Sequence, residues 1–149
     1  APLLIGAAFA GANPDQLRQL SEFGVPLGMA FQLRDDVLGV FGDSAITGKP
    51  AGDDLREGKR TVLIGYTRAS LTASVGKLFD EMLSSRELTD EQVSFLQQTI
   101  VGSKALEKVE RTITGLADQA MAALERIEID GQAKAQLKSM AQKVINRQA

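Results

Sequence analysis

Two adjacent carboxylates, Asp35 and Asp36, are the residues whose type and spacing most clearly suggest chemistry. They lie near the end of segment 20–41, which is apolar almost all the way around a helix, so we expect a central, largely enclosed helix. Neighbouring carboxylates in an enclosed place repel each other and lose hydration, so they need a proton, a basic side chain or a divalent cation. Mg²⁺ is the natural candidate, because it binds through one or two carboxylates and fills its other positions with water and substrate phosphate.

The helix face that carries these acids also holds Gln32 one turn earlier and Gly39 one turn later. The following residues, 42–58, are rich in glycine and contain Lys49, and Lys59 comes directly after them. We expect a loop with exposed backbone N–H groups and two point cations, which are groups that bind phosphate oxygens. Carboxylates for a metal and lysines for phosphate together predict a site for Mg²⁺-bound diphosphate.

Residues 31–61 carry the patterns F-Q-x-x-D-D, G-D, G-K-x-x-G-x-D and G-K-x-T in this order. This combination resembles the second aspartate-rich region of the trans-isoprenyl diphosphate synthases, also called polyprenyl synthetases. The resemblance implies an all-α fold, the C-terminal part of an isoprenoid-synthase-type helical bundle, with residues 1–149 as a portion of one domain. It also implies a Mg²⁺-dependent prenyltransferase of isoprenoid biosynthesis that condenses isopentenyl diphosphate with an allylic diphosphate. We expect a cytoplasmic homodimer without a membrane span.

The resemblance also implies roles for single residues. Asp35 and Asp36 would hold Mg²⁺ that bridges to the allylic diphosphate. Lys49 and Lys59 would contact that diphosphate, and Gln32 would face the developing carbocation. Each of these residues also has a plainer interpretation. The two acids could be a solvated acidic spot near a helix end, the two lysines could be ordinary surface lysines, and Gln32 could be a core amide.

Several neighbouring positions are ambiguous. The third acid of the family's D-D-x-x-D is Gly39 here, which bears on metal affinity and on the number of ions held. Asp54 best matches the acid of G-x-D, although a carboxylate that stabilises the loop through hydrogen bonds explains it equally well. We interpret Asp43 as a loop-capping acid rather than a metal ligand. Arg147 resembles the family's C-terminal arginine, but an exposed residue near a chain end is the default interpretation.

Composition and length exclude several other classes of function. The 149 residues include no cysteine and no histidine, so disulfides, thiolate chemistry, His-based triads and His-ligated zinc are excluded within the chain. A net charge of −2 gives no indication of a nucleic-acid surface. The first residues read as the middle of a helix, so we expect a C-terminal portion of a longer enzyme that is inactive alone and exposes apolar surface.

Two alternative functions remain open at this stage. A class I terpene cyclase shares the fold and would use the same diphosphate site for cyclisation, so product analysis separates it from an elongating enzyme. A non-catalytic subunit that stabilises a catalytic partner is the second alternative, supported by the replacement of the third acid by Gly39. Inability of the full-length protein to bind Mg²⁺-diphosphate would favour that subunit.

Helical periodicity and capping residues predict the elements along the chain. After a helix within residues 1–12, Asn13 caps a helix that continues to Phe41. Because Pro26 removes a backbone donor, we expect this helix to kink or break near residues 22–25. A capping box begins at Thr89, and a further helix starts after Asp130. The other helices are expected over residues 59–67, 71–84 and 104–127.

Overall fold

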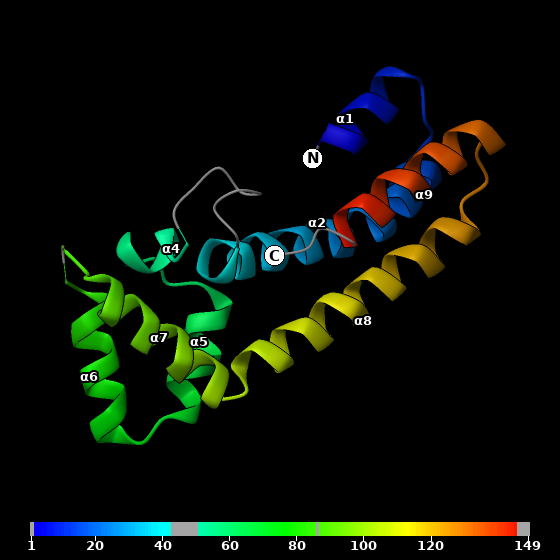
Figure 1. The fold of residues 1–149 in the computed structure, drawn as a ribbon. Coiled ribbons are helices and arrows are strands. Elements are labelled where there is room, and N and C mark those ends of the chain that lie inside the picture. Colours follow the sequence, from blue (N-terminus) through cyan, green and yellow to red (C-terminus); the bar gives the residue numbers. More distant parts are fainter. Residues whose placement is uncertain (1, 43–50, 86, 146–149) are drawn as a thin grey trace. The chain divides into compact units, whose positions relative to one another are not determined.

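The computed structural model describes residues 2–42, 51–85 and 87–145, and these residues form α-helices and no strand (Figure 1). The predicted all-α fold is therefore confirmed. Lys49, Asp43 and Arg147 lie outside the described residues, so their predicted roles stay predictions. The helices are α1 (Pro2–Phe9), α2 (Pro14–Phe41), α4 (Asp53–Arg56), α5 (Val62–Ser70), α6 (Ala73–Leu83), α7 (Asp90–Gly102), α8 (Ala105–Arg126) and α9 (Gly131–Ile145).

The described residues separate into two compact units. The first unit contains residues 2–32 and 112–145, and the second contains residues 33–42, 51–85 and 87–111. Helices α2 and α8 contribute residues to both units. That the whole chain is a portion of one isoprenoid synthase domain stays a prediction.

The core of the first unit is built from α1, α2, α8 and α9. Leu20 and Phe23 of α2 pack with Leu124 of α8 and Ala141 of α9, and each of these side chains is buried. Leu3 and Leu4 of α1 cover the edge of this cluster. The end of α8 therefore buries small and aliphatic side chains in this core.

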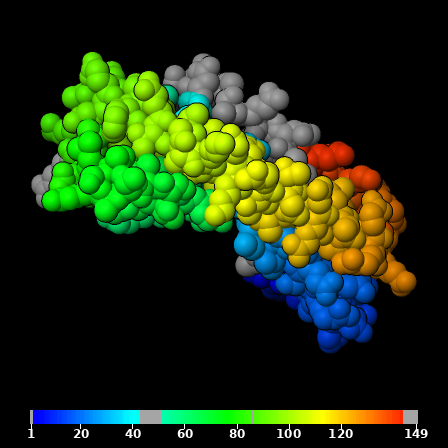
Figure 2. All heavy atoms as spheres, turned by 90° about the horizontal axis from the view of Figure 1, so that it is seen from below, coloured from blue at the N-terminus to red at the C-terminus, as the bar shows by residue number. Residues whose placement is uncertain are grey.

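The core of the second unit gathers buried side chains from the end of α2 and from α4 to α8. Helix α7 contacts both α4 and α5, and the atoms of α5 to α7 form a continuous green surface in Figure 2. The fully buried side chains include Val40, Leu55, Leu63, Phe79, Leu96, Ile100 and Val109. These contacts, rather than helix propensity, stabilise the short helices of this unit.

Helix α2 begins at the predicted cap. Asn13 Oδ1 accepts from the Gln16 backbone N–H at 2.9 Å, and Gln16 Oε1 accepts from the Asn13 N–H at 3.0 Å. The predicted break at Pro26 is wrong, because α2 runs through it for 28 residues. A proline removes one backbone donor, and Pro26 is buried, so its packing offsets that loss. Whether the helix axis bends there stays a prediction.

The predicted enclosure of α2 is confirmed near its end, where residues 36–38 and 40 are buried, whereas earlier in the helix it holds for one face only. Phe23, Ala30 and Leu33 are buried, whereas Val25 and Met29 are 56% and 52% exposed. Since residues three and four apart share a helix face, these two mark an apolar face open to solvent. None of the described helices is both long and apolar enough to cross a membrane.

Candidate functional site

The two adjacent acids lie in the second unit, one turn before the end of α2. Asp36 is only 9% exposed and Asp35 is half-buried. Gln32, one turn earlier on the same helix, is the last residue of the first unit and is exposed. The predicted burial of carboxylates on an otherwise apolar helix is therefore confirmed most clearly for Asp36. Burial makes a compensating positive charge necessary if both acids are ionised.

The residue before these acids anchors α2 to another helix of the second unit. Arg34 donates from Nη1 and Nη2 to the two carboxylate oxygens of Glu110 on α8, at 2.6 and 2.8 Å. The Arg34 side chain is 14% exposed, and a bidentate pair of this kind fixes orientation as well as contributing energy. This contact holds the rotation of α2 about its axis, and hence the direction of Asp35 and Asp36. The two residues are 76 positions apart in the sequence, so no local pattern could predict this ion pair.

The carboxyl end of α2 is held by a side chain from α7. Gln97 donates from Nε2 to the Val40 carbonyl oxygen at 2.6 Å, which satisfies one of the carbonyls that a helix leaves open at its end. The Gly42 N–H bonds the Leu38 carbonyl at 2.8 Å. The last turn of α2 is therefore well defined where it carries the acids.

The segment expected to be a plain loop contains the four-residue helix α4, so that expectation is corrected. Gly52 and Gly58 stand before and after it with φ angles of +76° and +65°, which few other residues adopt. A Cβ at Gly52 would also lie 2.5 Å from the Val93 side chain. Two glycines expected to expose backbone groups to a ligand thus also let the chain form a short helix against α7.

Lys59 is paired with two carboxylates of its own segment. Its Nζ donates to Asp54 Oδ1 at 2.5 Å and lies 3.0 Å from Glu57 Oε2. The hydrogen bond to Asp54, and then the one to Glu57, raise the pKa of Lys59 above its ordinary value. Lys59 is thus a fixed cation, with its side chain 44% exposed. Its ammonium can donate three hydrogen bonds, so its two carboxylate partners leave capacity for a phosphate oxygen.

Asp54 has the loop-stabilising role considered from the sequence. Its side chain is 11% exposed and receives the Lys59 hydrogen bond, and its backbone carbonyl accepts from the Lys59 N–H at 3.0 Å. Both contacts close the turn between α4 and α5. The threonine of G-K-x-T, Thr61, then caps α5 by accepting from the Ile64 N–H at 3.4 Å.

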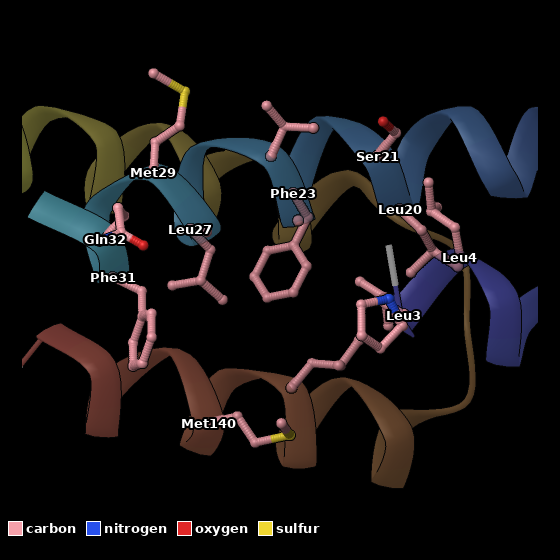
Figure 3. Close-up of a pocket in the computed structure, with 15 residues that line it drawn as sticks. Leu3, Leu4, Leu20, Ser21, Phe23, Leu27, Met29, Phe31, Gln32 and Met140 are labelled. Atoms are coloured by element: carbon pink, nitrogen blue, oxygen red, sulfur yellow. The ribbon is translucent and has the colours of Figure 1, made fainter. Parts of the chain in front are cut away.

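A separate apolar cavity of about 750 Å³ lies in the first unit. Phe23, Leu27 and Phe31 point from α2 into the space between α2 and α9, and Leu3 of α1 closes one end (Figure 3). Met140 of α9 also lines it, and Gln32 is one of its few polar lining residues. A hydrocarbon chain fits such a lining. The sequence did not reveal this cavity, because its walls come from residues more than 100 positions apart.

Carboxylate oxygens are the kind of ligand that a hard divalent cation prefers, but few of them lie together here. Among the residues that the structure describes, no group of three or more acidic side chains could enclose a metal ion. Asp35 and Asp36 offer two carboxylates, which is the number through which Mg²⁺ commonly binds when phosphate and water complete its shell. The residues present therefore fit Mg²⁺ held jointly with a phosphorylated ligand, rather than a cage formed by the protein alone.

Comparisons with known proteins agree with one another. A family model described as polyprenyl synthetase matches residues 1–100. Geranylfarnesyl diphosphate synthase of Aeropyrum pernix is 34% identical over 144 residues, which cover 96% of this chain and 44% of that protein. Geranylgeranyl diphosphate synthase of Saccharolobus solfataricus is 32% identical over 144 residues, with coverages of 96% and 43%.

The fold is similar to that of solved synthases. Geranylgeranyl pyrophosphate synthase from Corynebacterium glutamicum, crystallised with isoprenyl diphosphate and magnesium, superposes with a TM-score of 0.88 and 38% identity. The match covers 96% of this chain and 41% of that one. The chain thus spans less than half the length of these relatives.

Proposed function

The chain belongs to the polyprenyl synthetase family, and from this premise we propose that it forms part of a Mg²⁺-dependent prenyltransferase. The substrates are an allylic diphosphate and isopentenyl diphosphate. The observation that carries the proposal is the pair of adjacent acids near the end of α2, of which Asp36 is only 9% exposed and Asp35 is half-buried.

The reaction breaks the bond between the allylic carbon and the diphosphate oxygen, and the diphosphate leaves with the electron pair. The double bond of isopentenyl diphosphate then forms a new carbon–carbon bond with the allylic cation, and a proton is lost. No nucleophilic side chain of the protein is needed. Negative charge grows on the leaving diphosphate, so the required catalytic groups are cations that stabilise it.

Residues of this chain take defined roles in that reaction. Asp35 and Asp36 hold Mg²⁺, which supplies positive charge to the diphosphate when bound. Lys59 donates to a diphosphate oxygen. Gln32 faces the developing carbocation, as the family resemblance implies. In the first unit by itself, the apolar cavity lined by Phe23 and Leu27 suits a hydrocarbon chain.

Assembly and location are part of the same proposal. We expect the active form to be a cytoplasmic homodimer, as the resemblance implies. The solved structure of the Corynebacterium relative is a complex with isoprenyl diphosphate and magnesium, which supports a diphosphate and Mg²⁺ as the proposed ligands. The remainder of the family's length, which this chain does not cover, would supply the other aspartate-rich motif.

The test uses a hybrid synthase in which this chain replaces the matched 41% of the Corynebacterium enzyme. With Mg²⁺, an allylic primer and isopentenyl diphosphate, the hybrid should form elongated products, whereas the 149-residue chain alone should form none. Asp35→Ala combined with Asp36→Ala should slow elongation about 100-fold or more, because the charge-stabilising group loses its ligands. The control is Asp118→Ala, since Asp118 is an exposed acid of α8.

Elongation at an undiminished rate by the double variant would refute the metal role. Cyclic products instead of elongated ones would indicate a terpene cyclase. Both outcomes are read from the same product analysis.

A further inference from the structure

Gly39 occupies the position where the family pattern D-D-x-x-D has its third acid, and the structure fills the space beside it with another carboxylate. A Cβ built on Gly39 would lie 2.2 Å from Asp54 Oδ2 and 2.3 Å from Asp54 Cγ. Real Cβ atoms essentially never approach another heavy atom within 3.0 Å. The Asp54 carboxylate therefore stands where any side chain at position 39 would begin.

Asp54 is not free to move out of that space. Its side chain is 11% exposed, and its Oδ1 accepts from Lys59 Nζ at 2.5 Å. Its backbone is fixed in α4, which Arg56 ties to the start of α7 through hydrogen bonds to the Leu88 carbonyl and to Asp90, both at 2.5 Å. Displacing the carboxylate would separate it from Lys59 and leave a charge in a buried place.

We infer that Asp54 is a positioning residue that sets the place of Lys59, and that Gly39 is the residue which leaves room for it. The part of this inference that concerns Lys59 rests on the proposed function, whereas the contact between Gly39 and Asp54 does not. A carboxylate therefore does lie beside the last turn of α2, where the family pattern has its third acid. Here Asp54 of α4 supplies it, and not a residue of α2. An aspartate at position 39 would both collide with Asp54 and compete with it for Lys59.

The steric part is tested by measuring thermal unfolding of the full chain. Alanine normally stabilises a helix relative to glycine. If the contact with Asp54 is as close as described, Gly39→Ala should instead destabilise the chain. Gly39→Ala should lower Tm in the wild-type background and raise it in the Asp54→Ala background. Gly28→Ala on the same helix is the matched control, because a Cβ there meets nothing within 4 Å, and it should raise Tm in both backgrounds.

An equal change in Tm from Gly39→Ala in both backgrounds would overturn the inference, and so would a rise in the wild-type background. Gly39→Asp should be worse than Gly39→Ala in the wild-type background, because it adds like charge. These readouts need no substrate, so they stand apart from the proposed function.

The positioning part is tested by calorimetric titration with inorganic pyrophosphate and Mg²⁺. Asp54→Asn keeps the shape of the side chain but removes its charge, so affinity should fall about tenfold. Lys59→Met should cause a similar loss, and the double variant should lose little more than either single variant, because Asp54 acts through Lys59. Losses that multiply in the double variant would overturn the positioning role.

Failure of the wild-type chain to bind pyrophosphate would refute the proposed function and the role of Asp54 toward Lys59 together. The Tm measurements would still decide the contact between Gly39 and Asp54. The two failures are therefore distinguishable.

Discussion

The pair formed by Lys59 and Asp54 combines a partly exposed ammonium with a buried carboxylate. The two side chains are 44% and 11% exposed, so most of the cost of separating them falls on the carboxylate, which would lose its charged partner in a buried place. Glu57, 49% exposed, adds a weaker contact that solvent screens. A diphosphate oxygen near Lys59 would therefore meet a lysine whose direction is already set.

Lys59→Met should lower the free energy of unfolding by about 1 kcal/mol. This is the usual contribution of a hydrogen bond between charged groups, reduced because the Lys59 side chain is partly exposed to solvent. Because the folded-state pKa of Lys59 is raised, this contribution is fully present below the ordinary lysine pKa of about 10.4. It is lost as pH rises through the folded-state pKa. Urea unfolding from pH 7 to pH 11 measures the difference between the two proteins.

Lys77→Met is the control for this prediction, since the Lys77 side chain is 79% exposed and lies 3.9 Å from Glu81. It should change stability little at any pH. If the difference between wild type and Lys59→Met disappears well below pH 9, the ion pair does not have the strength described above.

Helix ends are the element-scale feature that sequence patterns predicted best. The capping box at Thr89 is formed in full: Thr89 Oγ1 accepts from the Gln92 N–H at 3.3 Å, and Gln92 Oε1 accepts from the Thr89 N–H at 2.9 Å. Asp130 caps α9 by accepting from the Gln132 N–H at 2.9 Å. Caps are predictable because donor and acceptor are three or fewer residues apart.

Thr89→Ala should destabilise the chain by about 1 kcal/mol, the usual loss for an N-cap hydroxyl. Thr72 offers a matched control, because it occupies the N-cap position of α6 without a side-chain hydrogen bond. Thr72→Ala should therefore cost clearly less in the same denaturation experiment. Equal losses for the two variants would mean that the Thr89 cap bond contributes nothing.

Features that depend on contacts between distant residues escaped sequence analysis. Helix α4 forms because the glycines before and after it adopt positive φ angles and because Arg56 binds the segment that leads into α7. A helix of four residues is too short to be predicted from a hydrophobic period. The break expected at Pro26 does not occur, since packing outweighs one missing hydrogen bond. Asp35, Asp36 and Lys59 could be predicted as site residues because motif spacing is local, and their roles stay predictions. The pair formed by Arg34 and Glu110 joins residues 76 positions apart, so it follows only from tertiary structure.

At the scale of the whole molecule, the described residues leave much apolar surface exposed. Phe9 is 91% exposed, Ile5 56% and Met140 62%, all in the first unit. The curated relatives are more than twice as long as the part that this chain matches. A covering partner or further copies of the chain would bury this surface. The homodimer expected from the resemblance stays a prediction.

Titration of the 149-residue chain with inorganic pyrophosphate, with and without Mg²⁺, tests the central claim most directly. We predict binding that requires Mg²⁺ and that is lost when Asp35→Ala and Asp36→Ala are combined, because these carboxylates would hold the metal that supplies positive charge to the diphosphate. Asp118→Ala should bind like the wild type. Binding of equal strength without Mg²⁺, or in the double variant, would contradict the account.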